Sequence, residues 1–155
     1  MYDDILLPVA PDGKDNAAIP HVESLAERYD ATVHVVSAAD TIEHTLSGPR
    51  IGSLAERVES AAQERVDEIS ERLSAAGADV EGHVVRGEPL NVIEDAIKES
   101  GADIVVMPSH NRKGLSRFLL GSVTEKVVRI SPVPVVTVPM PSANENVEEA
   151  GEEEE

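Results

Sequence analysis

Short apolar segments alternate with segments of helical period along most of the chain. The apolar runs have the length and β-branched content of buried strands, and they lie at residues 5–9, 31–36, 80–85, 104–107 and 133–138. Between them, apolar residues recur every three or four positions, which is the spacing of one helix face. Strands that alternate with helices predict a parallel sheet with helices on both faces. The fold class is therefore α/β, with a doubly wound open parallel sheet.

The periodic segments predict helices at 19–29, 51–73, 90–97 and 122–130. Gly77 follows the longest of them, where a left-handed C-terminal cap favours glycine, and Gly101 stops the next. Polar stretches that contain Gly and Pro predict long loops at 38–50 and 108–120.

The length of 155 residues suits one domain. We expect a folded domain over residues 1–140 and an acidic, disordered tail over 141–155, because the tail has almost no apolar residues to bury. No apolar run approaches the roughly 20 residues that span a bilayer, and no basic leader precedes one. A cytoplasmic protein without a membrane partner is therefore expected. Because cysteine is absent, disulfides and thiolate chemistry are excluded.

Acidic residues strongly outnumber basic ones. The chain has 30 Asp and Glu against 13 Lys and Arg, a formal net charge of −17, and most of this excess lies outside the tail. Such a surface repels the phosphates of nucleic acid, so no nucleic-acid partner is expected. We interpret the charge as halophilic, a surface suited to high salt, where screening reduces self-repulsion. An ordinary acidic protein that uses charge for solubility is the alternative.

The last apolar run contains prolines, which assigns it to an edge of the sheet. Pro132 and Pro134 lack the N–H groups that a central strand needs on its ladders. An open apolar edge invites pairing with another chain. We therefore expect either a homodimer through Val133 to Val138 or cover of this edge by the tail.

A candidate ligand site follows from the fold class. In open α/β sheets, ligands bind beyond the carboxyl ends of the strands, here in the loops after Val9, Val36 and Met107. The last of these loops ends at Gly121-Ser122-Val123-Thr124, where a helix begins and its N–H groups suit a phosphate. Basic residues gather in and just after this loop: Arg112, Lys113, Arg117, Lys126 and Arg129. Alternatively, Gly121 makes a turn, Ser122 caps the helix and the bases neutralise nearby carboxylates.

Three segments resemble one known family. ILLPV near the start, VVRGEPLNVIEDAI in the middle and ADIVVMPSHNRKGLSRFLLGSVTEKVVRISPVPVVTV near the end are similar to universal stress proteins, over residues 3 to about 139. The resemblance implies an adenine-nucleotide-hydrolase-like, Rossmann-like sheet of five parallel strands in the order 3-2-1-4-5. It also implies a homodimer built on the last strand, in agreement with the edge prolines.

The resemblance also implies a nucleotide site, from which this chain departs. Nucleotide-binding members carry a Gly-x2-Gly-x9-Gly-Ser/Thr signature around the phosphates, and here its frame aligns at Pro108, Asn111, Gly121 and Ser122. Proline lacks an N–H and adds a ring, which hinders close approach of a ligand, whereas Asn is a milder change. The family's Asp after the first strand is replaced by Ala10. The candidate nucleotide-binding residues are Ala10, Asp12, Ala38, Met107, Pro108, His110, Asn111, Gly121, Ser122, Val123 and Thr124.

Asp12 is included because Asp12-Gly13 resembles a displaced Asp-Gly pair of the family. The backbone near Ala38 is expected to recognise adenine, and His110 is interpreted as a residue that positions the loop.

Two functions remain open. One is a small stress-response or regulatory dimer that acts through an unknown protein partner, with weak or no nucleotide binding; Pro108 and Ala10 favour it. The other is a protein that binds ATP, with Mg²⁺, or AMP, and uses the 107–124 loop as a phosphate cradle. An enzyme, at most a slow ATPase, ranks third because no base or metal is evident. The histidines show no metal-ligand spacing with nearby carboxylates, so no metal site and no catalytic residue is predicted.

The interpretation of the charge as halophilic predicts a salt dependence of stability. Chemical denaturation at low and at molar salt should show a clear gain in the free energy of unfolding with salt, because screening weakens repulsion among the excess carboxylates. A flat response would favour the ordinary acidic protein.

Overall fold

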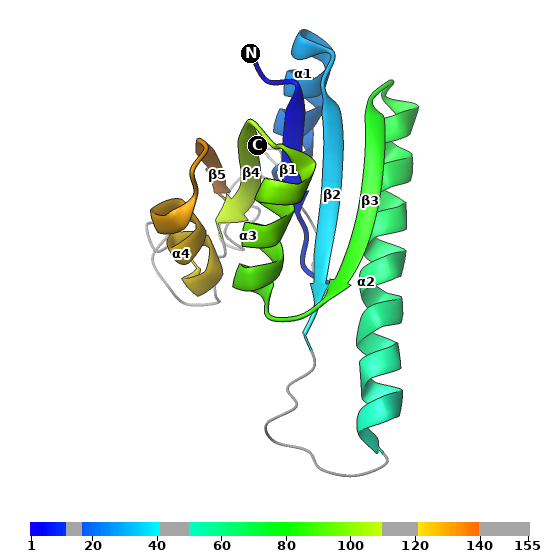
Figure 1. Cartoon of the computed structure of the whole chain (residues 1–155). Coiled ribbons are helices and arrows are strands. Elements are labelled where there is room, and N and C mark those ends of the chain that lie inside the picture. Colours follow the sequence, from blue (N-terminus) through cyan, green and yellow to red (C-terminus); the bar gives the residue numbers. More distant parts are fainter. Residues whose placement is uncertain (12–16, 41–49, 110–120, 140–155) are drawn as a thin grey trace, which may run out of the picture.

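The computed structural model describes residues 1–11, 17–40, 50–109 and 121–139. In this part of the chain, five parallel strands form one sheet in the order β3-β2-β1-β4-β5 (Figure 1). The predicted α/β class and the strand order implied by the resemblance are confirmed. The elements are β1 Asp4–Pro8, α1 Ile19–Tyr29, β2 Thr32–Ala39, α2 Arg50–Ala75, β3 Asp79–Arg86, α3 Pro89–Ser100, β4 Ile104–Ser109, α4 Ser122–Ile130 and β5 Val135–Pro139.

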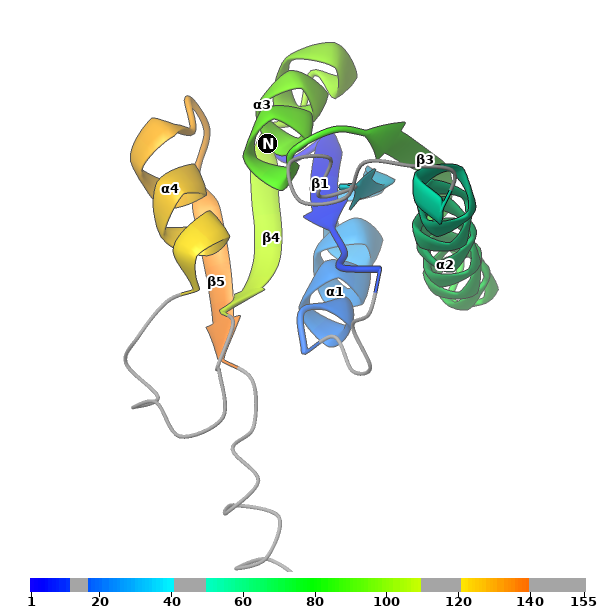
Figure 2. The same cartoon turned by 90° about the horizontal axis from the view of Figure 1, so that it is seen from below.

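The helices cover the sheet in two layers. Figure 2 looks at the carboxyl ends of the strands, with α1 and α2 on one side of the sheet and α3 and α4 on the other. Because side chains alternate along a strand, Ile5 and Leu7 pack into the core under α1 and α2, whereas Leu6 packs into the core under α3 and α4. Each helix contributes its buried apolar stripe to one of these two cores, as the helical periodicity predicted.

Both glycines expected beyond helix ends have positive φ. Gly101 is the left-handed C-cap of α3 with φ 67°, and Gly77 follows α2 with φ 96°. Glycine adopts this region without the steric cost that a Cβ imposes. The predicted ends of both helices are therefore confirmed.

The predicted loop at 108–120 begins too early. Pro108 and Ser109 belong to β4, where they stand in register with Val138 and Pro139 of β5. Proline keeps a φ that a strand tolerates, and at a strand end only one ladder donor is lost. The structure therefore corrects the role of Pro108 from a loop residue to a strand residue.

The last strand begins two residues later than predicted. Ser131 makes a local turn, since its hydroxyl donates to the Val133 carbonyl at 2.7 Å and accepts the Val133 N–H at 3.2 Å. Pairing with β4 starts after Pro134, whose carbonyl accepts the Val105 N–H at 2.9 Å. The position of β5 at the edge of the sheet is as predicted.

None of the helices in the described residues is long and apolar enough to cross a membrane.

Packing of α2 against β3 depends on a glycine in the strand. A Cβ added at Gly82 would lie 2.7 Å from Val66 Cγ1 and 3.2 Å from Ser70 Oγ, both on α2. A β-branched valine has little freedom to move aside.

We therefore expect Gly82→Ala to lower the free energy of unfolding by about 1–3 kcal/mol, the usual cost of overpacking. In a Val66→Ala background the added methyl group gains room, so the same change should cost much less. Chemical denaturation of the single and double variants measures this difference. Equal costs in both backgrounds would contradict the proposed clash.

Candidate functional site

The neighbouring strands β1 and β4 separate towards their carboxyl ends. β1 and β4 pair at Ile5 with Ile104 and at Leu6 with Val105. Beyond this point β1 continues to Pro8 and β4 to Ser109 without further pairing between them. Pro8 and Pro108 have no N–H to donate to a ladder, which is consistent with the early end of this pairing. The switch point of the strand order therefore opens into a crevice.

A cavity of about 310 Å³ lies at this crevice. Its walls are formed by the ends of β1, β2 and β4 and by the first turns of α3 and α4. Fifteen residues line it: Pro8, Val9, Ala10, Pro11, Val36, Ala38, Pro89, Val92, Ile93, Met107, Pro108, Gly121, Ser122, Val123 and Thr124. Most of these side chains are apolar. The volume falls at the lower end of the range of small-molecule sites, and an apolar lining with few polar groups is typical of them.

The polar groups of the cavity are concentrated at the start of α4. Gly121 is the N-cap with extended backbone, and its carbonyl accepts the Glu125 N–H at 2.9 Å. The N–H groups of the first turn have no partner within the helix, and no side chain caps them in the described structure. The hydroxyl of Ser122 lies on this exposed turn. This end of α4 can therefore donate hydrogen bonds to an anion at the mouth of the cavity.

One side-chain contact fixes α4 against the sheet. The buried Thr124 hydroxyl donates to the Pro108 carbonyl at 3.3 Å. The helix start and the strand end therefore meet on one wall of the cavity.

The structure brings together eight of the predicted site residues. Ala10, Ala38, Met107, Pro108 and the run Gly121 to Thr124 all line the cavity. Asp12, His110 and Asn111 lie outside the described residues, as do the predicted tail and most of the 107–124 loop. The described ends of that segment are a strand and a helix rather than a loop.

Sequence reasoning missed the wall that α3 provides. Pro89, Val92 and Ile93 line the cavity, although Val92 and Ile93 are also buried in the core under α3 and α4. The helical period of this segment marked its core-facing side. α3 directly follows β3 and lies on the same face of the sheet as α4, so its first turn begins at the carboxyl ends of the strands. This order of elements was the signal that could have placed the first turn of α3 at the cavity.

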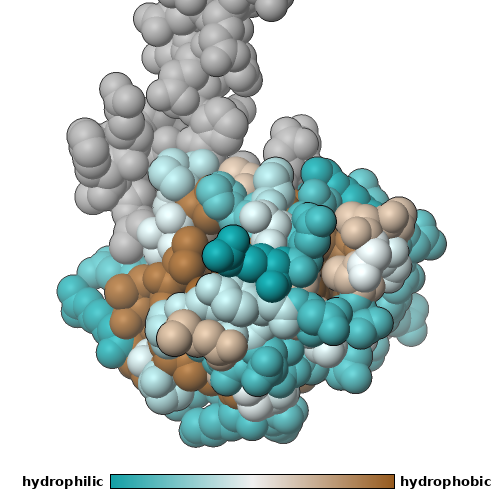
Figure 3. Space-filling view, turned by 90° about the horizontal axis from the view of Figure 1, so that it is seen from above, coloured by the Kyte–Doolittle hydropathy of each residue, from teal (hydrophilic) through white to brown (hydrophobic). Residues whose placement is uncertain are grey.

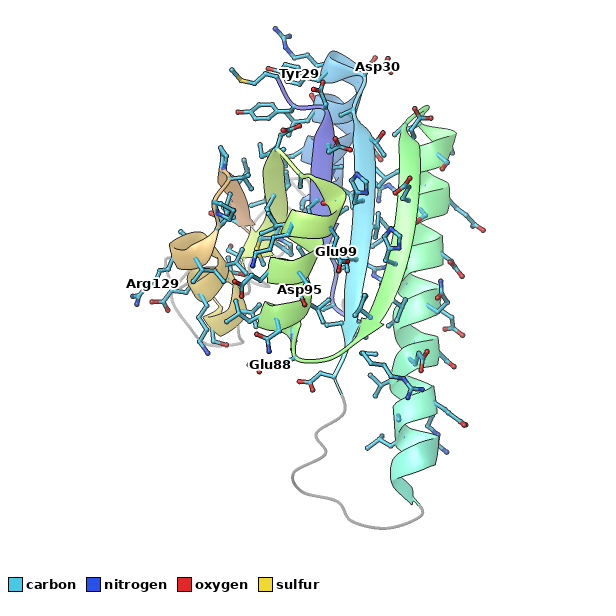
Figure 4. The ribbon with its side chains drawn as sticks, viewed as in Figure 1. Tyr29, Asp30, Glu88, Asp95, Glu99 and Arg129 are labelled. Atoms are coloured by element: carbon cyan, nitrogen blue, oxygen red, sulfur yellow. The ribbon has the colours of Figure 1, made fainter. Side chains whose placement is uncertain are left out.

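The charged side chains of Glu88 and Arg129 do not line the cavity. Glu88 is the N-cap of α3 at the lower end of the helix in Figure 4. Arg129 extends outward from the far end of α4 and pairs with Glu125 at 2.8 Å (Figure 4). Arg129, one of the predicted basic cluster, is therefore turned away from the cavity.

Comparisons with known proteins agree with this architecture. The family model "Universal stress protein family" matches residues 1–139. The chain belongs to the universal stress protein family.

Individual relatives are distant but extend over nearly the whole chain. Universal stress protein MJ0531 of Methanocaldococcus jannaschii is 29% identical over 91% of this chain and 84% of its own length. The solved structure of MJ0577 from the same organism is 28% identical, with a TM-score of 0.79 over 92% of this chain and 99% of that one.

A universal stress protein in complex with cAMP has a TM-score of 0.68 at 23% identity, over 90% of this chain and 99% of that one. Universal stress proteins have also been solved with AMP bound, from Arabidopsis thaliana, and in complex with dAMP, from Archaeoglobus fulgidus. At these identities the likeness of the nucleotide complexes establishes the shared fold.

Proposed function

We propose that this universal stress protein is a regulatory protein that binds an adenine nucleotide in the cavity between β1 and β4. The cavity itself carries the proposal, because it is an apolar hollow at the switch point with a helix N-terminus at its mouth. Pro108 and Ala10 had favoured a member without nucleotide. Both residues line the cavity, and its volume of about 310 Å³ remains open with their side chains in place.

The apolar part of the cavity suits a purine base. Apolar side chains surround it with flat contacts: Val36 and Ala38 of β2, Val92 and Ile93 of α3, and Met107 of β4. Backbone groups at the end of β2, near Ala38, are available to recognise the edge of the base. The fold neighbours whose bound ligands are AMP, cAMP and dAMP support an adenine base in particular.

The phosphate end of the cavity is better suited to one phosphate than to three. The first turn of α4 offers N–H groups and the Ser122 hydroxyl at a single point. Glycine is absent from positions 108 and 111, where the family signature has it around a longer phosphate chain. We therefore propose a nucleoside monophosphate as the preferred ligand, with ATP and Mg²⁺ binding more weakly.

Calorimetric titration of nucleotide-stripped protein with AMP, and with ATP and Mg²⁺, tests this proposal. Ser122→Ala should weaken AMP binding roughly ten- to hundredfold, because a hydrogen bond to a charged group contributes about 1.5–3 kcal/mol. Ser122→Thr keeps the hydroxyl and serves as the matched control. Ala38→Leu should abolish binding because it fills the part of the cavity assigned to the base.

Absence of binding by the parent protein for both nucleotides would reject the proposal. It would leave the interaction protein as the preferred function. Binding that Ser122→Ala and Ala38→Leu leave unchanged would place the nucleotide elsewhere on the protein.

We also propose that the protein forms a homodimer through β5, as expected from its edge position. Figure 3 shows hydrophobic surface on the side of the molecule where Figure 1 places α4 and β5. Val128 and Ile130 of α4 and Val136 of β5 are exposed there. An exposed apolar patch beside an open strand edge supports association of two copies.

A charge at this edge should separate the subunits. We expect Val136→Asp to shift the protein from dimer to monomer in sedimentation equilibrium, because an unpaired carboxylate would be buried in the interface. Val85→Asp is the matched control, since Val85 lies on the opposite edge strand and is similarly exposed, at 44% against 37% for Val136. A monomeric parent, or a dimer disrupted by Val85→Asp alone, would contradict the proposal.

A further inference from the structure

Among the described elements, part of the sheet has a helix on one face only. α2 packs against β2 and β3 on one face, whereas α3 packs on β1 and β2 on the other face. Figure 1 shows α3 in front of the central strands and the front of β3 uncovered beside it. Polar side chains of β3 occupy this open face, and Glu81 and His83 are 61% and 57% exposed.

A histidine of β2 completes a cluster with these two residues. His34 and Glu81 are in register on neighbouring parallel strands, and His83 follows Glu81 by two positions, so all three side chains project from the same face. His34 Nδ1 lies 3.3 Å from Glu81 Oε2, and His83 Nε2 lies 3.9 Å from the same oxygen. All three ligand atoms lie within 4.8 Å of one another.

His34 is held in place by a second carboxylate. Its Nε2 lies 2.8 Å from Asp4 Oδ1 of β1, and its side chain is only 9% exposed. A neutral ring that donates its Nε2–H to Asp4 presents the lone pair of Nδ1 towards Glu81. A lone pair and a carboxylate oxygen at 3.3 Å repel each other unless a proton on Nδ1 or a metal ion lies between them. The geometry at Nδ1 therefore accommodates a metal ion in place of a proton.

We propose that His34 Nδ1, Glu81 and His83 Nε2 bind a Zn²⁺ ion on this open face. Two imidazoles and one carboxylate are a ligand set that zinc prefers, whereas Mg²⁺ and Ca²⁺ prefer oxygen ligands alone. Asp4 takes the part of the outer carboxylate that orients a zinc-binding histidine and fixes its tautomer.

The spacing of the ligand atoms fits such an ion with small adjustments. Bonds of about 2.0–2.1 Å in a tetrahedral site place two ligands about 3.4 Å apart. The His34–Glu81 spacing of 3.3 Å already meets this value. The exposed side chains of Glu81 and His83 have the freedom to close the remaining gaps. Three protein ligands leave the fourth position to water or to a group from another molecule.

This site is separate from the nucleotide cavity. None of its three ligands, nor Asp4, lines that cavity. Failure of nucleotide binding would therefore leave the zinc proposal standing, and the reverse also holds.

Titration of metal-free protein with Co²⁺ tests the proposal, because a tetrahedral Co²⁺ site has characteristic visible absorption bands. Competition with Zn²⁺ then gives the affinity of the site for zinc. We expect one Co²⁺ per chain, displaced by Zn²⁺. His83→Gln should remove the bands while thermal unfolding without metal stays unchanged, because this side chain is largely exposed.

His21→Gln is the matched control, since it removes an exposed histidine of α1 and should bind Co²⁺ as the parent does. Asp4→Asn should weaken Co²⁺ binding about 10–100-fold through loss of the orienting charge. A parent without tetrahedral bands, or a His83→Gln variant that binds as the parent does, would overturn the proposal. Oxygen-only binding by the acidic surface gives neither result, because it is not tetrahedral and does not depend on His83.

Discussion

The point at which the β1–β4 ladder stops determines where the cavity of this protein opens. Up to Leu6 and Val105 the central strands are joined, and both cores continue across them. Past that point β1 stays paired only with β2 and β4 only with β5, and each continues to a proline-containing end. The chain reverses its strand order at this pair, so among the described elements no crossover helix lies over the opening. The first turns of α3 and α4 form the walls instead, and Thr124 holds α4 to the end of β4.

The ion pairs of the acidic residues contribute little to the stability of this fold. Two arginines of the described residues pair with acids across elements: Arg72 of α2 with Glu23 of α1 at 3.2 Å, and Arg86 of β3 with Glu59 of α2 at 2.6 Å. Each exposed pair of this kind contributes at most about 1 kcal/mol, and salt screens it. The two apolar cores must therefore supply the stability. The excess negative charge determines the character of the surface and the salt concentrations at which the folded state tolerates that surface.

The sequence predicted those features that depend on local pattern. Apolar runs and helical periods placed every strand and helix of the described residues, and the prolines near β5 assigned it to an edge. The pattern was less informative where one residue had two interpretations. Pro108 was expected to open a loop, but its φ is also allowed at a strand end, and pairing with Val138 decides the matter. Val92 and Ile93 belong to the apolar period that predicted the helix at 90–97, but periodicity gives the face of a helix and not what lies beyond its first turn.

The histidine cluster was missed for a different physical reason. Metal-ligand motifs are recognised by short spacings along one segment, whereas His34 and Glu81 are 47 positions apart in the sequence and become neighbours only through the parallel register of β2 and β3. Glu81 and His83 have the spacing of two that places side chains on one face of a strand. That spacing alone is common in exposed strands. A sequence without the register therefore contains half of the site and no indication of the other half.

The same strand carries both proposed sites. His34, Val36 and Ala38 alternate onto one face of β2, so the zinc ligand and the cavity wall lie next to each other along the chain. Coupling between two sites requires an element with two discrete arrangements that each ligand favours differently. β2 is paired on both sides, with β1 from Thr32 to Val36 and with β3 from Thr32 to Ala39, and its other face is buried under α2. A strand fixed on both edges and on one face has little room for a second arrangement. We therefore infer that the two sites are neighbours in structure and independent in affinity.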